Sequence, residues 1–99
     1  MKKYQIGNNY YELIEEYRDG FDLNEVTEKM TDYFDDFDYI IGDWAYGKLR
    51  LKGFCEKDNP RFNEINDYTM KDDYLKNNCA YECRYFVLKK VKKEKIEKE

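Results

Sequence analysis

The chain has 99 residues, of which 40% are charged and 18% aromatic, and its formal net charge is −4. A chain of this length forms one domain with a single core. Its aromatic side chains, which bury large areas, offset a charge content that would otherwise indicate disorder. No apolar run approaches the ~20 residues that span a bilayer, which argues against a membrane protein. We expect one domain over residues 1–99, with flexible ends at about 1–8 and 92–99.

The charge is unevenly distributed along the chain. Residues 1–47 carry four Lys/Arg against twelve Asp/Glu, whereas residues 48–99 carry fourteen against ten. Such a dipole can steer charged partners, although it can equally serve only to keep an aromatic-rich domain in solution. The amino-terminal residues lack the apolar segment of a signal peptide, and we therefore expect a cytoplasmic protein with reduced thiols.

The first half of the chain predicts a strand, a helix and a second strand. Residues 10–17 are rich in β-forming side chains and are followed by a turn signal. Asp22 stands three residues before a glutamate, as an N-cap does, and the apolar residues behind it recur with helical spacing. We therefore expect a helix over residues 22–35. Bulky β-formers at residues 38–44 predict the next strand.

The most distinctive stretch is Gly42–Phe54, which holds the only Trp and an alternating Lys/Leu/Arg/Leu/Lys run. Its period of two predicts a half-buried strand over residues 48–54. Residues 45–47 form the preceding hairpin loop, in which Gly47 supplies the positive φ. The run places Leu49 and Leu51 toward the core and its cations, Lys48, Arg50 and Lys52, toward solvent.

The second half predicts an edge strand at residues 61–65, a helix at 69–77 capped by Thr69, and a last strand at 82–91. Residues 85–88 are apolar on both faces, which is typical of a central strand covered on both sides. Local connections of this kind favour a mainly antiparallel sheet of four to five strands with two helices packed on it. The predicted fold is therefore α+β, in a single small domain.

Three segments carry a family resemblance: residues 11–21, 39–54 and 83–90. The ungapped GDW-x-YG-x-LRLKGF stretch is the most specific part, and the similarity extends over roughly residues 10–93. The chain resembles the YutD-like family, small cytosolic proteins of low-GC Gram-positive bacteria. The resemblance implies an α/β domain and a cytosolic location, and it carries over no activity and no catalytic or ligand-binding residue.

One group of residues has the composition of a nucleic-acid site. Cations neutralise phosphates, and rings near them stack on bases, so a shared basic and aromatic face is typical of single-strand binding. The candidate residues are Lys48, Arg50 and Lys52, with Trp44 and Tyr46 at the nearby turn. The alternative is a solvated strand face that pairs with neighbouring carboxylates, with Trp44 as a hairpin or core ring.

The thiols and acidic clusters give no metal site. Cys79 and Cys83 are spaced C-x3-C and Cys55 lies apart, whereas structural zinc takes four Cys/His ligands and a redox motif is C-x-x-C. We expect the three to be small buried hydrophobic residues. Residues 19–25 superficially resemble a calcium loop but lack its ligand spacing. We therefore expect no metal and no cofactor.

Several classes of enzyme are excluded. The chain has no His, so it has no Ser-His-Asp or Cys-His nucleophile system. It has neither a P-loop nor a G-x-G-x-x-G motif, and no pair stands out among its 22 carboxylates. No catalytic residue is assigned, and an enzyme would have to rest on carboxylates or Cys83. The sequence favours a non-enzymatic, regulatory or macromolecule-binding module acting through a protein partner. The alternative is RNA or single-stranded DNA binding through the hairpin face.

Overall fold

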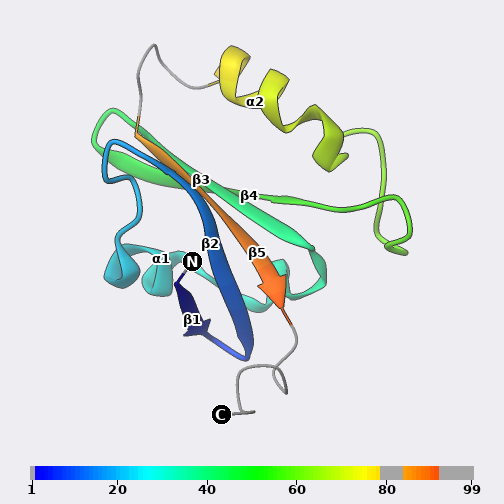
Figure 1. The fold of residues 1–99 in the computed structure, drawn as a ribbon, viewed down its shortest axis with the longest axis horizontal. Coiled ribbons are helices and arrows are strands. Elements are labelled where there is room, and N and C mark those ends of the chain that lie inside the picture. Colours follow the sequence, from blue (N-terminus) through cyan, green and yellow to red (C-terminus); the bar gives the residue numbers. More distant parts are fainter. Residues whose placement is uncertain (1, 79–83, 92–99) are drawn as a thin grey trace.

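The computed structural model describes residues 2–78 and 84–91 and contains a five-stranded antiparallel sheet with a helix on each face (Figure 1). The strands are β1 (Lys3–Ile6), β2 (Asn9–Tyr17), β3 (Tyr39–Ala45), β4 (Lys48–Phe54) and β5 (Tyr85–Val91). The helices are α1 (Leu23–Lys29) and α2 (Lys71–Asn78), with short 3-10 helices η1 (Asp32–Asp36) and η2 (Tyr68–Met70). In these described ranges no helix has both the length and the apolar character needed to cross a membrane. The predicted α+β class is confirmed.

The last strand of the chain lies at the centre of the sheet. The strand order is β1-β2-β5-β3-β4, and β5 pairs antiparallel with both β2 and β3. Phe86, Val87 and Leu88 of β5 are fully buried although they alternate between the two faces. The central strand predicted from residues 85–88 is therefore confirmed. Residues 82–83 of the predicted strand lie outside the described residues.

Each face of the sheet carries its own hydrophobic cluster, because each is covered by helical segments (Figure 1). Under α1 and η1 the buried side chains are Ile6, Tyr11, Val26, Ile40, Leu49, Phe86 and Leu88. Under η2 and α2 they are Tyr39, Ile41, Phe54 and Val87. These two clusters explain why so polar a chain folds. Each Å² of apolar surface that leaves water stabilises the folded state by about 25 cal/mol, and aromatic rings bury large areas.

The prediction of an edge strand at residues 61–65 is wrong. That segment is a turn, because the side chains of Asn63 and Asn66 take up its backbone hydrogen bonds. The fifth strand is instead β1, which lies within residues 1–8, the segment that we expected to be a flexible end. It pairs with β2 and buries Ile6 completely. The other expected flexible end, residues 92–99, lies outside the described residues.

The first helix begins as predicted and ends early. Asp22 is its N-cap and accepts from the backbone N–H of Glu25 at 3.2 Å. We expected the helix to continue to residue 35, but Met30 is extended, with φ −75° and ψ 130°. Thr31 then accepts from the backbone N–H of Tyr33 and begins η1. A threonine hydroxyl that competes for backbone groups in this way interrupts a helix.

The second helix and the hairpin turn also differ in detail from the prediction. Asp67, rather than Thr69, caps the helical segment, because its side chain accepts from the backbone N–H of Thr69 at 2.9 Å. The β3–β4 connection has two residues instead of three. Tyr46 and Gly47 have φ of 55° and 75°, and this left-handed pair matches the twist of the strands that it joins.

A polar network attaches α2 to the sheet. Lys71 of α2 forms an ion pair with Glu15 of β2 at 2.9 Å, and the hydroxyl of Tyr85 donates to the same carboxylate at 2.8 Å. Tyr74 and Leu75 of α2 pack against the second hydrophobic cluster. Burial, followed by the hydrogen bond to Glu15, raises the pKa of Tyr85 to about 12. Within the described residues, these side chains are what attaches the helix to the sheet.

Replacement of Gly42 tests the closeness of β3 and β5. A Cβ at this position would overlap the ring of Phe86, which is fully buried. We expect Gly42→Ala to lower the free energy of unfolding by about 1–3 kcal/mol, measured in urea. In the double variant with Phe86→Leu the two losses should be less than additive, since the smaller side chain makes room. Strict additivity would contradict the contact.

Alkaline unfolding tests the docking of α2. An unfolded tyrosine has a pKa of about 10, whereas that of Tyr85 is raised to about 12. The folded state therefore holds this proton more tightly, so its stabilisation is complete below pH 10 and is lost between about pH 10 and 12. We expect the free energy of unfolding to fall less steeply over this range in Tyr85→Phe than in the unaltered protein. Equal slopes in the two proteins would contradict the assignment.

Candidate functional site

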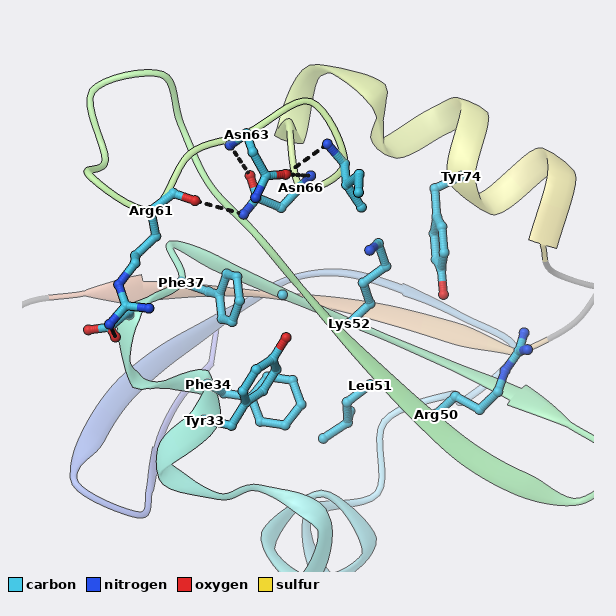
Figure 2. A pocket seen from close by; sticks show the side chains of 13 residues that line it. Tyr33, Phe34, Phe37, Arg50, Leu51, Lys52, Arg61, Asn63, Asn66 and Tyr74 are labelled. Carbon is cyan, nitrogen blue, oxygen red and sulfur yellow. Dashed lines mark hydrogen bonds and ion pairs between the residues drawn. The ribbon is translucent and has the colours of Figure 1, made fainter.

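A groove of about 750 Å³ lies beside β4, the strand at one edge of the sheet (Figure 2). It is lined by η1, β4, the loop between β4 and η2, and α2. Its aromatic rings are Tyr33, Phe34, Phe37 and Tyr74, and its cations are Arg50, Lys52 and Arg61. One carboxylate, that of Asp36, is part of the lining. The groove is therefore aromatic and, in its lining, predominantly basic.

The alternation of the strands determines which backbone groups of β4 face the groove. The amide of Trp44 in β3 donates toward β5 at 3.1 Å, so the odd-numbered residues of β3 pair with β4. The register then directs the even-numbered residues of β4 to β3. The backbone N–H and C=O groups of Leu49, Leu51 and Gly53 point the other way, where the described sheet has no further strand. In agreement, the amide of Cys55, the next odd-numbered residue, donates away from β3 to the carbonyl of Asn66 at 2.7 Å.

The first wall of the groove is the aromatic cluster of η1. Tyr33 is 70% exposed, and its ring centroid lies 5.0 Å from that of Phe34 and 5.5 Å from that of Phe37. Phe37 lies directly over Gly53 of β4, where any side chain would overlap its ring. Glycine at this position therefore lets η1 approach the open edge closely and present its rings beside it.

The second wall comes from α2 and includes the aliphatic stem of a lysine. Tyr74 points from α2 toward the sheet, and Lys52 projects from the sheet toward α2 beside it (Figure 2). The ammonium group of Lys52 lies 5.3 Å from the centroid of Phe54 and 5.9 Å from that of Tyr74. Such contacts contribute about 0.5–1 kcal/mol each. Lys52 is thus half-buried rather than facing solvent, which corrects the prediction for this residue.

A hydrogen-bonded loop forms the end of the same wall. The buried side chain of Asn66 accepts from the backbone N–H of Asn63 at 2.9 Å and donates to the carbonyl of Arg61 at 3.0 Å. The guanidinium group of Arg61 pairs with Asp36 of η1 at 3.1 Å. This loop presents Ile65, 77% exposed, to the groove. The loop is held in shape by its own side chains.

An ion pair joins the groove lining to a buried carboxylate beneath it. Asp43 of β3 is completely buried, and its Oδ2 accepts from Arg50 of β4 at 2.5 Å, while the arginine side chain is 48% exposed. The hydrogen bond to Asp43 raises the pKa of Arg50. Within the described residues Asp43 Oδ1 has no hydrogen-bond partner. Because the buried carboxylate of Asp43 needs the charge of Arg50, the guanidinium group is held near it.

The structure separates the residues of the predicted nucleic-acid face. Lys48, Arg50 and Lys52 do share one face of β4, whereas Trp44 lies on the opposite face of the sheet. Its indole N–H donates to the carbonyl of Gly20 at 2.8 Å, and the guanidinium carbon of Arg84 lies 4.3 Å from the ring centroid. Tyr46 is fully exposed at the turn, and Lys48 is exposed. Of these five residues only Arg50 and Lys52 line the groove.

The predicted thiols contribute nothing to the groove in the part of the chain that is described. Cys55 is buried at the end of β4, and burial raises the pKa of its thiol. Cys79 and Cys83 lie outside the described residues. No group of three His, Cys, Asp or Glu side chains able to hold a metal occurs within the described ranges.

Sequence reasoning missed the groove because its walls come from distant segments. Tyr33, Phe34 and Phe37 continue the apolar spacing of the helix predicted over residues 22–35, and Tyr74 falls in the helix predicted over residues 69–77. The signal that was available is Asp43: a lone carboxylate in an apolar strand, with a hairpin turn placing it opposite Arg50. That pairing predicts a polar position on the face under α2.

Comparisons with known proteins place this chain in a family. The family model described as "Putative antitoxin YutD-like" matches residues 5–89. The "Putative antitoxin YutD" of Bacillus subtilis (strain 168) is 38% identical over 88 residues, which are 89% of this chain and 97% of that protein. The solution NMR structure of protein yutD from B. subtilis superposes with a TM-score of 0.77 at 35% identity, covering 94% of this chain and 84% of the other. The chain belongs to the YutD-like family, and the resemblance noted in its sequence is confirmed.

The ion pair between Asp43 and Arg50 can be tested by a double-mutant cycle. Arg50→Gln leaves a buried carboxylate without its cation, and we expect it to lower the free energy of unfolding by about 1–3 kcal/mol in urea. Asp43→Asn should cost less, because the half-exposed guanidinium group is still hydrated. In the double variant the loss should stay close to that of Asp43→Asn alone. Arg50→Lys, which keeps the charge, is the matched control. Additive losses would contradict the pairing.

Proposed function

We propose that this member of the YutD-like family is a non-enzymatic cytoplasmic module that acts by binding a protein partner in the groove beside β4. The observation that carries the proposal is the open edge of β4 between two walls of aromatic and cationic side chains. Aromatic rings and arginines are enriched at protein interfaces, and the edge of a sheet can pair with a strand from another chain. The reaction chemistry of an enzyme is not needed to account for any of these features.

The exposed apolar groups of the groove support a macromolecular partner. Tyr33 and Ile65 are 70% and 77% exposed on opposite walls, and both line the groove. Apolar groups gathered at one surface, with polar residues around them, are typical of interaction sites. The hydrogen-bonded loop around Asn66 and the packing of Phe37 on Gly53 pre-shape both walls, which reduces the entropy lost on binding.

The family description suggests what kind of protein the partner is. The relative from B. subtilis is named a putative antitoxin, and an antitoxin acts by neutralising a toxin. For this chain we take the partner to be a toxin protein whose surface is covered when it binds the groove. This specification goes beyond the fold and depends on the family name alone.

RNA or single-stranded DNA binding through Lys48, Arg50, Lys52, Trp44 and Tyr46 stays a prediction. The three cations are on one face, as that prediction requires. The indole of Trp44, however, is hydrogen-bonded and covered by Arg84 on the other face. A base could stack on Tyr46, whose ring is fully exposed, but not on a surface that these five residues share. We therefore favour the protein partner.

Site-specific crosslinking in cells tests the proposed function. A photoreactive residue at Ile65, in the groove, should capture one discrete protein, whereas the same residue at Gln5, exposed on the opposite edge strand, should not. The captured protein, purified and mixed with this chain, should form a stoichiometric complex. Tyr33→Ala should weaken that complex about tenfold or more, because tyrosine is enriched among the interface residues whose truncation costs about 2 kcal/mol or more.

Two outcomes would contradict the proposal. Capture of the same proteins from Ile65 and Gln5 would mean that the groove is no specific surface. Capture of RNA instead of protein at Ile65, lost at raised salt, would favour the nucleic-acid alternative. If the captured protein is a toxin, its effect on cell growth should be relieved by the unaltered chain and not by Tyr33→Ala.

A further inference from the structure

The open edge of β4 offers a regular row of backbone hydrogen-bonding groups at the floor of the groove. Leu49, Leu51 and Gly53 each direct one N–H and one C=O away from β3, at every second residue of the strand. Leu51 and Gly53 line the groove, and Leu51 is partly exposed, whereas Leu49 lies beyond the lining and both Leu49 and Gly53 are buried in the unbound chain. The spacing along such a row, about 6.6–6.8 Å between like groups, is that of another β-strand. Neither a small ligand nor a helix has donors and acceptors at this repeat.

The side chains beside this row differ between the two faces of the sheet. Leu49 and Leu51 lie on the face covered by α1 and η1, and Leu51 lines the groove together with Tyr33 and Phe34. Arg50 and Lys52 lie on the face covered by α2. In a sheet, directly opposite side chains share a face and interact. An added strand would therefore meet apolar groups at every second position and cations at the positions between.

Charge complementarity determines the chemistry of the occupant. The lining holds three cations, of which Arg50 pairs with Asp43 and Arg61 with Asp36, while the ammonium group of Lys52 lies over the rings of Phe54 and Tyr74. Exposed Lys48 extends the row of cations on the α2 face. Carboxylates opposite these cations contribute roughly 0.2–1 kcal/mol per pair, whereas cations there are unfavourable. The matching strand alternates acidic and apolar residues.

A second copy of this chain is a poor occupant of the same edge. Antiparallel pairing of two β4 strands about a two-fold axis perpendicular to the sheet keeps like faces together. Lys48 and Lys52 of one copy would then lie opposite Lys52 and Lys48 of the other. Like charges directly opposite one another destabilise a strand pair, so the arrangement that attracts an acidic strand discourages self-pairing.

We infer that the partner binds by adding an extended segment, in which acidic and apolar residues alternate, antiparallel to the open edge of β4. The inference rests on the proposed function and specifies how the partner is held. Its backbone pairs with β4 around Leu51, its apolar side chains pack beside Tyr33 and Phe34, and its carboxylates face Lys48 and Lys52. Strand addition of this kind takes affinity from the main chain and specificity from alternate side chains.

A synthetic probe tests the mode of binding without the natural partner. The probe is a blocked seven-residue peptide that alternates glutamate and valine, added to the full chain and followed by NMR. We expect saturable shifts at β4, and an exchange rate of the amide of Leu51, the partly exposed residue of the row, that falls about tenfold or more on binding, since it becomes hydrogen-bonded. A peptide with lysine in place of glutamate is the charge control and should bind at least about tenfold more weakly.

Backbone methylation of the probe provides a matched pair. In the inferred arrangement the valine nitrogens face β4 and the glutamate nitrogens face away. Methylation of the valine nitrogens should abolish binding, whereas methylation of the glutamate nitrogens should leave it nearly unchanged. Absence of binding by the unmethylated probe at millimolar concentration, or equal effects of the two methylations, would overturn the inference.

A variant of the chain separates this inference from the proposed function. Leu51→Pro removes an N–H that points to the groove and leaves the β3–β4 ladder intact, and Leu51→Ala controls for the lost packing. We expect the complex with the protein captured at Ile65 to be lost in Leu51→Pro and kept in Leu51→Ala. A complex that survives Leu51→Pro would leave the protein-binding function standing and overturn strand addition.

Discussion

The insertion of β5 between β2 and β3 is the constraint on which the rest of this structure depends. β5 is the last strand in the chain, yet it lies third in the sheet and is buried on both faces. Both faces must consequently be covered, which assigns α1 and η1 to one side and α2 to the other. It also displaces the β3–β4 hairpin to the margin, so that β4 has a partner on one side only. The open edge is thus a consequence of the topology.

The segments that cover the two faces also make the walls of the groove. η1 reaches the edge because Gly53 admits the ring of Phe37, and α2 reaches it through Tyr74 above Lys52. The Asp43–Arg50 pair fixes the cation at the far end of the groove, since a buried carboxylate needs its guanidinium group. Packing positions η1 and α2 beside the edge of β4, and the ion pair positions Arg50 there.

The sequence predicted the parts of this fold that depend on local pattern. Alternation located β4, apolar character on both faces identified β5 as central, and Asp22 marked the start of α1. The errors have a common cause. Whether residues 61–65 or 3–6 provide the fifth strand depends on which one finds a neighbouring strand. That depends in turn on contacts between distant segments, which no local period encodes.

The candidate site was predictable only in part, for the same reason. The two cations of β4 that line the groove, Arg50 and Lys52, came from the alternating run. The position of Trp44 could not be predicted from that run, because its partners Gly20 and Arg84 lie 24 residues before it and 40 residues after it. The cations on the open edge have two effects. Charged side chains on an edge strand discourage it from pairing with the same strand of a second copy. Because protection by like charge vanishes for a strand of opposite charge, the same residues that prevent self-association leave the edge available to an acidic partner.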